Sequence, residues 1–233
     1  MSIIPIFIPH AGCPHQCVFC NQKTISGQKT AALEGAKEQI NKWLSYVSPN
    51  VKHKAAFYGG SFTGLDMNLQ EELLHLTDDL YEKGIIDSVR LSTRPDYIDA
   101  ARLEFLAKHH VKTIELGVQS LDDKVLAKAE RGHSAECVYQ AAELIKSFGF
   151  KLGLQLMVGM PGQDFASLKD TTAKAVSIKP DIARIYPLLV IKNTPLAKSY
   201  ESGEFVPLAL EEAVEQAAYL YERLIAVNVN VIR

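Results

Sequence analysis

Short apolar segments alternate with longer amphipathic segments along the whole chain. The short segments are rich in β-branched residues and predict strands; they cover residues 3–8, 54–58, 86–92, 112–118, 151–158 and 182–189. Between them, apolar residues recur at the spacing of a helix with one buried face. Two such stripes are Leu33, Ala36, Ile40, Trp43, Leu44 and Val47, and Leu210, Val214, Ala217, Tyr221, Leu224 and Ile225.

Six consecutive strand–helix units predict parallel strands joined by right-handed crossovers. Such strands form either an open doubly wound sheet or a barrel, and a regular repeat of about 30–40 residues favours the barrel. We therefore expect an α/β fold, a partial (β/α)6 TIM-like barrel, as a single domain over residues 1–233. Residues 227–233 alternate like the start of a seventh strand. Because a parallel strand is an unusual place for a chain to stop, we expect a longer protein.

The composition narrows the class of protein. The chain is 47% hydrophobic and 22% charged, as expected of a folded globular protein. A net charge of −2 gives no overall basic signature for nucleic acid. Residues 1–8 are apolar but too short to cross a membrane, and they lack the features of a signal peptide. We expect a cytoplasmic protein without membrane contact.

Three cysteines lie within eight residues, at Cys13, Cys17 and Cys20. In a reducing compartment such a group is typical of metal binding rather than of disulfides. Because 4Fe-4S clusters usually have four thiolate ligands, three predict a cluster with one iron open for chemistry. The alternative is a zinc site completed by His10 or His15, although no second metal-binding knuckle follows in the sequence.

The predicted carboxyl ends of the strands carry the other candidate functional residues, as expected of α/β folds. The segments there begin with the cysteines and continue with Tyr58–Gly64, Ser92–Asp96, Gly117–Ser120, Gly159–Gln163 and Tyr186–Pro187. Glycines such as Gly59 and Gly60 let a backbone approach a ligand closely, although a tight turn also requires glycine. For Arg94, a surface salt bridge is the simpler interpretation.

Three polar residues stand out against apolar surroundings. Gln119 and Gln155 place amides at or near the ends of apolar strands, where a buried amide needs partners such as ligand hydroxyls or a structural hydrogen bond. Arg131 precedes a predicted helix and has the geometry to bind a carboxylate bidentately or to cap that region. Cys137 lies on an apolar helical stripe, which favours core packing over metal binding.

The CxxxCxxC motif, with the aromatic Phe19 directly before the third cysteine, resembles that of the radical S-adenosylmethionine superfamily. Within it the chain is similar to the radical domain of the Elongator catalytic subunit and its bacterial relatives, and more distantly to oxygen-independent coproporphyrinogen dehydrogenase. The segments that carry the resemblance span nearly the whole chain in the family's order: Gly12–Gln22, Tyr58–Gly64, Ser92–Tyr97, Gly117–Ser120, Arg131–His133 and Ile185–Thr194.

The resemblance implies cofactors and their ligands. Cys13, Cys17 and Cys20 are expected to bind a 4Fe-4S cluster whose fourth iron chelates S-adenosylmethionine. Its remaining contacts are implied as follows: Gly59, Gly60 and Ser61 to the amino group, Arg131 to the carboxylate, Gln119 and Gln155 to the ribose, and Phe19, Met160 and Tyr186 around the adenine. Where relatives commonly have Glu at the end of the third strand, this chain has Ser92.

The implied activity is the generation of a 5′-deoxyadenosyl radical that abstracts hydrogen from a substrate, with a flavodoxin or ferredoxin as electron donor. Transfer RNA uridine is the first candidate substrate, and a porphyrinogen or another small molecule is the alternative. A zinc-stabilised interaction module without catalysis is the third hypothesis. It gives no reason for glycines, glutamines and an arginine at later strand ends.

Overall fold

A computed structural model describes residues 2–8, 13, 17–21, 32–46, 48 and 51–232 of the chain. Its seven strands form one sheet in chain order, from β1 to β7. The strand pairs β1–β2, β2–β3, β5–β6 and β6–β7 are parallel. Parallel strands in sequence order are the winding of a (β/α) barrel rather than of a doubly wound sheet, so the predicted α/β, partial TIM-like fold is confirmed.

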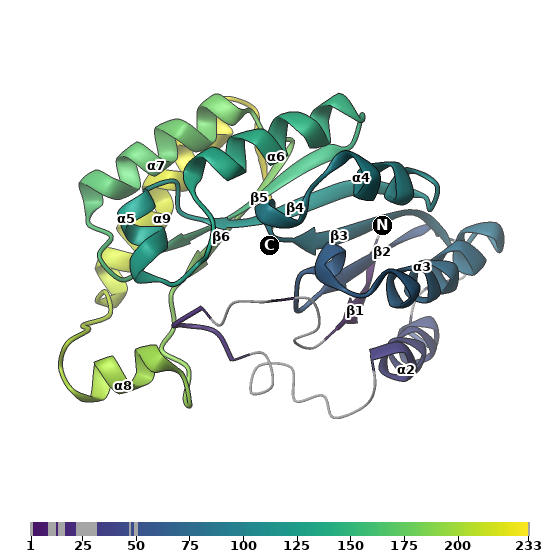
Figure 1. Cartoon of the computed structure of the whole chain (residues 1–233), viewed down its shortest axis with the longest axis horizontal. Coiled ribbons are helices and arrows are strands. Elements are labelled where there is room, and N and C mark those ends of the chain that lie inside the picture. Colours follow the sequence, from purple (N-terminus) through teal and green to yellow (C-terminus); the bar gives the residue numbers. More distant parts are fainter. Residues whose placement is uncertain are drawn as a thin grey trace. The chain divides into compact units, whose positions relative to one another are not determined.

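The described residues form two compact units. The first comprises residues 2–8, 13, 32–46, 48, 51–115 and 144–150. In this unit α2 packs against β1 and α3, and α3 packs against β3 (Figure 1). Its elements are β1 (Ile3–Phe7), α2 (Ala32–Leu44), β2 (His53–Tyr58), η1 (Phe62–Gly64), α3 (Met67–Glu82), β3 (Ile86–Thr93), η2 (Pro95–Tyr97) and α4 (Ala100–Ala107).

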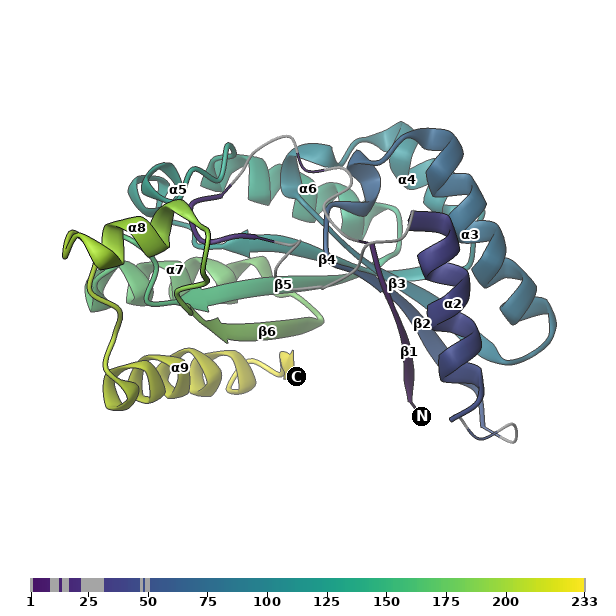
Figure 2. The same cartoon turned by 90° about the horizontal axis from the view of Figure 1, so that it is seen from below.

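The second unit comprises residues 17–21, 116–143 and 151–232. Here α9 packs against α7 and β6 (Figure 2). Its elements are α5 (Asp123–Lys128), β5 (Lys151–Val158), α7 (Phe165–Ile178), β6 (Ile182–Pro187), α8 (Pro195–Glu201), α9 (Leu210–Ile225) and β7 (Asn230–Val231). Strand β4 (Val111–Gln119) and helix α6 (Ala135–Ser147) each contribute residues to both units.

Side chains at the helix starts explain where several helices begin. Asp66, Asp99, Asp122, Asp164 and Thr194 each accept a hydrogen bond from a backbone N–H in the first turn of the helix that follows. Such N-caps satisfy amides that have no partner within the helix. Each of these helices comes after the loop at the carboxyl end of a strand. The caps therefore also set where those loops end.

The strand predictions agree with the structure, since all six predicted strands are present within two residues of their expected ends and β7 lies inside the predicted seventh. The predicted buried face of α9 is wrong in part. Of the predicted stripe, Leu224 is buried, whereas Leu210, Val214, Tyr221 and Ile225 are between 43% and 74% exposed; Leu220, which is also buried, was not predicted. The apolar period identified the helix, but it did not indicate how much of its apolar face is covered by other elements. Among the described residues, no helix has the length and apolar character needed to cross a membrane.

Candidate functional site

The residues 17–21, which we call the cysteine segment, form a tight turn in the second unit. The N–H of Cys20 donates to the carbonyl of Cys17 at 3.0 Å. Cys17 is buried and Cys20 is half-buried. The turn brings Cys17 and Cys20, the second and third cysteines of the motif, close together. Cys17 is enclosed by protein, and Cys20 is partly exposed to solvent.

Backbone hydrogen bonds hold this segment in place from two directions. The N–H of Val18 donates to the carbonyl of Ala129 at 3.2 Å, just after α5. The carbonyl of Val18 in turn accepts from the N–H of Leu196 at 2.9 Å, in the first turn of α8. Both backbone groups of Val18 are thus paired, as buried backbone requires. The cysteine segment is therefore attached to the rest of its unit.

Arg131 connects the cysteine segment to β4. Its side chain is buried, and one guanidinium nitrogen, Nη1, donates to Cys17 Sγ at 3.1 Å. The other, Nη2, donates to the carbonyl of Gly117 in β4. Because guanidinium stays charged in proteins, this arrangement sets a permanent positive charge beside the sulfur. A cation at this distance attracts negative charge on the sulfur.

Gln119, the last residue of β4, lies in the left-handed region with φ of 68°. Such a conformation is uncommon for residues other than glycine and, where it occurs, often marks a functional position. Its side-chain oxygen, Oε1, is buried and has no hydrogen-bond partner within the described part of the chain. A buried amide oxygen normally has a donor. Gln119 Oε1 is therefore a buried acceptor to which no described residue donates a hydrogen bond.

An apolar cluster lies against the cysteine segment. Phe19 packs on it, and Met160 forms part of it together with Val125 and Ala129. The loop that carries Met160 is held by Gln163, whose Oε1 accepts from the N–H groups of Gly159 at 2.8 Å and Met160 at 3.2 Å. Two of the residues expected around adenine, Phe19 and Met160, therefore share one apolar surface.

The remaining predicted residues of this unit lie on β5 and β6. Gln155 is half-buried in the middle of β5, beside Arg184 of β6. Tyr186 lies near the end of β6, beside Met157, and is 40% exposed. Both stand on adjacent parallel strands, with Tyr186 two positions nearer the carboxyl end in this register.

The glycine loop after β2 belongs to the first unit. Gly59 has φ of 95°, and a Cβ at this position would lie 3.1 Å from the carbonyl oxygen of Ile8. The N–H of Ile8 donates to Tyr58 at 2.8 Å, which continues the β1–β2 pairing to this point. Both the backbone angle and the close approach require glycine at Gly59.

Ser61 begins a chain of buried hydroxyl groups. Its Oγ lies 2.8 Å from Thr93 Oγ1, which lies 2.6 Å from Thr63 Oγ1. Thr63 donates to the carbonyl of Tyr97, so its hydroxyl accepts from Thr93, and Thr93 in turn accepts from Ser61. Ser61 also accepts from the N–H of Arg94 at 3.2 Å. Its proton is committed, and one lone pair is left to accept a hydrogen bond from an ammonium group.

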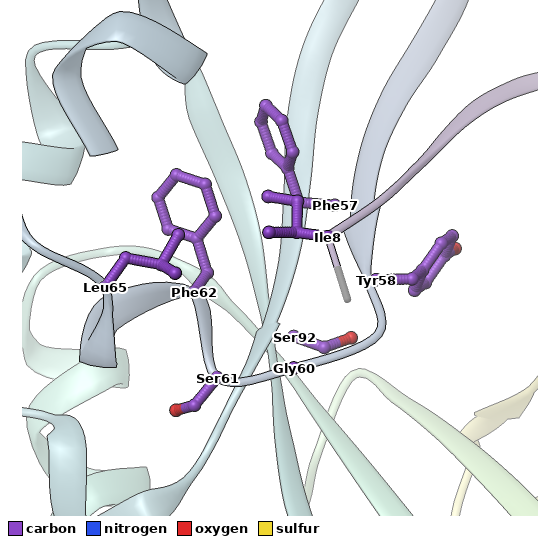
Figure 3. A pocket seen from close by; sticks show the side chains of 8 residues that line it. All are labelled: Ile8, Phe57, Tyr58, Gly60, Ser61, Phe62, Leu65 and Ser92. Atoms are coloured by element: carbon purple, nitrogen blue, oxygen red, sulfur yellow. The ribbon is translucent and has the colours of Figure 1, made fainter. Parts of the chain in front are cut away.

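Ser92 lines a small hollow next to this loop, with room for about one water molecule, about 10 Å3. Figure 3 shows Phe62 and Leu65 side by side along the hollow, with the Tyr58 ring pointing away from them. The rest of the lining is Ile8, Phe57, Gly60 and Ser61. The hollow is too small for a nucleoside, so the apolar side chains here support the loop.

Comparison with known proteins decides the class of this site. Residues 7–175 match the Radical SAM superfamily, and residues 180–233 match the Radical_SAM C-terminal domain. The chain belongs to the radical SAM superfamily. The predicted enzyme class is thereby confirmed, and the cofactors expected from the cysteine motif, a 4Fe-4S cluster and S-adenosylmethionine, are those of this family.

Curated relatives of this radical SAM chain include tRNA uridine(34) acetyltransferase of Methanocaldococcus infernus, 26% identical over 94% of this chain and 49% of the relative. Heme chaperone HemW of Bacillus subtilis is 30% identical over 90% of this chain and 56% of that protein. The human Elongator complex protein 3 is 28% identical over 56% of this chain. The chain thus spans about half the length of the first two of these relatives.

Solved structures show the same fold. The archaeal Elp3 of Methanocaldococcus infernus has a TM-score of 0.78 at 24% identity, covering 99% of this chain and 56% of that one. Coproporphyrinogen III oxidase (HemN) of Escherichia coli has a TM-score of 0.70 at 17% identity, covering 97% of this chain and 52% of that one. The predicted similarity to the Elongator catalytic subunit is confirmed by the sequence relatives and this fold.

The donor set fits the radical SAM cofactors. Cys17 and Cys20 supply sulfur ligands of the type that hold iron in such clusters, and Arg131 places a cation next to one of them. Gln119 offers a buried acceptor that a hydroxyl donor would satisfy. Cys13 is half-buried in the other unit. His10 and His15, the zinc alternatives, lie outside the described residues.

Sequence reasoning missed several groups that hold the site. It named Arg131 as a carboxylate ligand but not its bond to Cys17, 114 residues away in the chain. It quoted Thr93 and Gln163 within loops without a role. Hydroxyl and amide side chains that follow strands were a usable signal for both. Arg94 does form a salt bridge, with Asp96 at 2.9 Å, but its side chain is buried rather than on the surface.

Proposed function

We propose that this chain is a radical SAM enzyme in which Cys13, Cys17 and Cys20 hold a 4Fe-4S cluster and whose substrate is uridine in transfer RNA. The observation that carries the proposal is the buried sulfur of Cys17 paired with the Arg131 cation. A structural zinc knuckle has no need of a buried arginine that reaches from the loop after α5 to one of its sulfurs.

When bound, the cluster supplies the electron that cleaves S-adenosylmethionine to methionine and a 5′-deoxyadenosyl radical, which abstracts hydrogen from the substrate. The chain's own residues bind and orient that cofactor. We assign the amino group to Gly59, Gly60 and Ser61, because the Ser61 hydroxyl is left only as an acceptor. Ser92, the second-last residue of β3, lines the same hollow as Gly60 and Ser61 and is assigned to the same end of the cofactor.

The other assignments fall in the second unit. Arg131 is assigned to the carboxylate as well as to Cys17. Gln119 and Gln155 are assigned to the ribose hydroxyls, and Phe19, Met160 and Tyr186 border the adenine. The apolar cluster under Phe19 excludes water from this side. A flavodoxin or ferredoxin is the proposed electron donor.

Transfer RNA is the preferred substrate because curated relatives named tRNA uridine(34) acetyltransferases align over most of the chain. For this chain we propose only the formation of the radical and the abstraction of hydrogen, and not the acetyl transfer named in those relatives. A tetrapyrrole is the second candidate, supported by the likeness to HemW and to the HemN fold.

The cluster is tested by anaerobic reconstitution with iron and sulfide, followed by dithionite, S-adenosylmethionine and measurement of 5′-deoxyadenosine. We expect release by the wild type and by Cys137→Ala, which removes a half-buried cysteine of α6. Cys17→Ala should abolish it. If Cys17→Ala releases as much 5′-deoxyadenosine as Cys137→Ala, the proposed cluster ligands are wrong.

The substrate is tested separately, by whether it accelerates 5′-deoxyadenosine release. Transfer RNA with uridine at position 34 should accelerate release, and the same RNA with cytidine there should not. Binding of the RNA should weaken steeply with salt, because phosphate contacts release counterions. Acceleration by a porphyrinogen and not by either RNA would replace the first candidate with the second.

A further inference from the structure

Two histidines and an aspartate gather in the first unit, outside the radical SAM residues described above. His75 and Asp78 lie on α3, and His109 lies between α4 and β4, two residues before β4 begins. The spacing of three residues puts His75 and Asp78 on one face of the helix. This group precedes β4, whereas Gly117 and Gln119, which belong to the proposed cofactor site, lie at the carboxyl end of that strand.

The donor atoms of these three residues lie within 4.8 Å of one another, counting one atom from each side chain. His109 Nδ1 is 2.7 Å from Asp78 Oδ2. The rings of His75 and His109 meet edge to face, with centroids 5.6 Å apart. The ring of Phe105 lies against His109 at 4.9 Å. His109 is thus held between an aromatic ring and a carboxylate, which fixes its orientation.

The hydrogen bond between Asp78 and His109 does not account for the whole group. That hydrogen bond uses one oxygen of the carboxylate. The other, Asp78 Oδ1, is buried and has no hydrogen-bond partner in the part of the chain that the structure describes. A buried carboxylate oxygen is strongly disfavoured without a donor or a cation. His75 adds an imidazole next to it, which as a neutral ring has a lone pair to offer.

We propose that His75, Asp78 and His109 bind a divalent transition-metal ion of the zinc class. Two imidazoles and one carboxylate are ligands that zinc accepts, whereas calcium and magnesium prefer oxygen alone. Zinc ligands stand about 2.0–2.2 Å from the ion, so neighbouring donors are a little over 3 Å apart. The present donors reach that spacing by side-chain rotation, and His75, which is exposed, is able to rotate.

Such an ion joins α3 to the start of β4, two elements far apart in sequence. The amino ends of barrel strands serve stability rather than catalysis in this fold class. The metal is therefore assigned a stabilising role, separate from the cysteine site and independent of the proposed function. Its fourth position is left to water.

The test uses the full chain with Cys13, Cys17 and Cys20 replaced by alanine, so that thiolates do not compete for the metal. Titration with Co2+ should give one bound ion with visible absorption and no sulfur-to-metal charge-transfer band. Zn2+ should displace it and raise the melting temperature, because a ligand that binds only the folded state stabilises it.

Two matched substitutions decide whether these residues are the ligands. In that cysteine-free protein, His75→Gln should weaken Zn2+ binding at least about tenfold and abolish the Zn2+-dependent rise in melting temperature. Since His75 is exposed, the melting temperature of the His75→Gln protein without metal should equal that of the parent. His110→Gln alters the neighbouring histidine, which stacks on Tyr81 instead, and should bind Zn2+ as the parent does. Failure of the parent to bind Co2+ or Zn2+, or equal affinity in both variants, overturns the proposal.

Discussion

The contact between Arg131 and Cys17 makes a quantitative prediction for the cluster of the proposed function. Replacing Arg131 by methionine keeps a long side chain but removes its charge. It also removes the donors to Cys17 Sγ and to the Gly117 carbonyl. Arg131→Lys is the matched control, since it keeps the charge and loses the fork of two donors.

The expected shift in reduction potential follows from Coulomb's law. A unit charge 3.1 Å from the sulfur is worth about 5 kcal/mol at an effective dielectric constant of about 20. An added electron spreads over the whole cluster, so roughly a quarter of this acts at Cys17, about 1.3 kcal/mol. For a one-electron couple that is about 60 mV. Since the cation favours the reduced form, the potential of Arg131→Met should fall.

The assay is a potentiometric titration of the reconstituted protein, monitored by electron paramagnetic resonance. Arg131→Met should have a midpoint about 60 mV more negative than the wild type, and Arg131→Lys should lie much closer to the wild type. The cluster-free Met variant should also lose about 2 kcal/mol of unfolding free energy, because the buried Gly117 carbonyl has lost a donor. Identical midpoints for all three proteins would refute the electrostatic reasoning.

Three further predictions concern stability. Gly59→Ala should lower the unfolding free energy by about 2–3 kcal/mol, against about 1 kcal/mol for Gly84→Ala, which also has a positive φ but no atom within 4 Å of the added Cβ; equal losses in denaturant titrations would remove the contact argument. Thr93→Val should cost about 2 kcal/mol, because two buried hydroxyls lose their partner, and an unchanged melting temperature would contradict the hydroxyl chain. Burial alone would raise the pKa of Asp122, but hydrogen bonds from Ser167 and the α5 backbone hold this pKa below its ordinary value of 3.8. The ionised group therefore stabilises the fold above that pH. The loss of about 1 kcal/mol in Asp122→Ala should shrink in urea titrations as pH falls through the lowered pKa; a pH-independent difference would be inconsistent with this.

The strands and helices were predictable because each period reflects a local requirement. The predicted strand 112–118 lies within β4, and the predicted apolar stripe from Leu210 to Ile225 spans α9. Which element packs on a helix face depends on the tertiary fold and not on the local sequence. Val214 fits the apolar stripe of α9, yet it is 60% exposed, since the period records which residues share a face and not what packs there.

The residue types of the candidate site were predictable from the sequence, but the contacts between those residues were not. The spacing of the cysteines, and glycine at Gly59, reflect local chemistry and backbone angles. The bond from Arg131 to Cys17 depends on how a loop after α5 meets a segment more than 100 residues earlier. The left-handed conformation of Gln119 likewise had no sequence signal, because glycine is the residue usually expected there.

The hydroxyl chain of Ser61, Thr93 and Thr63 limits which substitutions homologues tolerate at these three positions. Each hydroxyl gives its proton to the next in one fixed direction, ending at the Tyr97 carbonyl. Losing the middle member alone leaves two buried hydroxyls poorly paired, and losing an end member takes a partner from a backbone group, the Arg94 N–H or the Tyr97 carbonyl. The effects of substitutions at these three positions should therefore depend on one another, and homologues should tend to carry the three hydroxyls together.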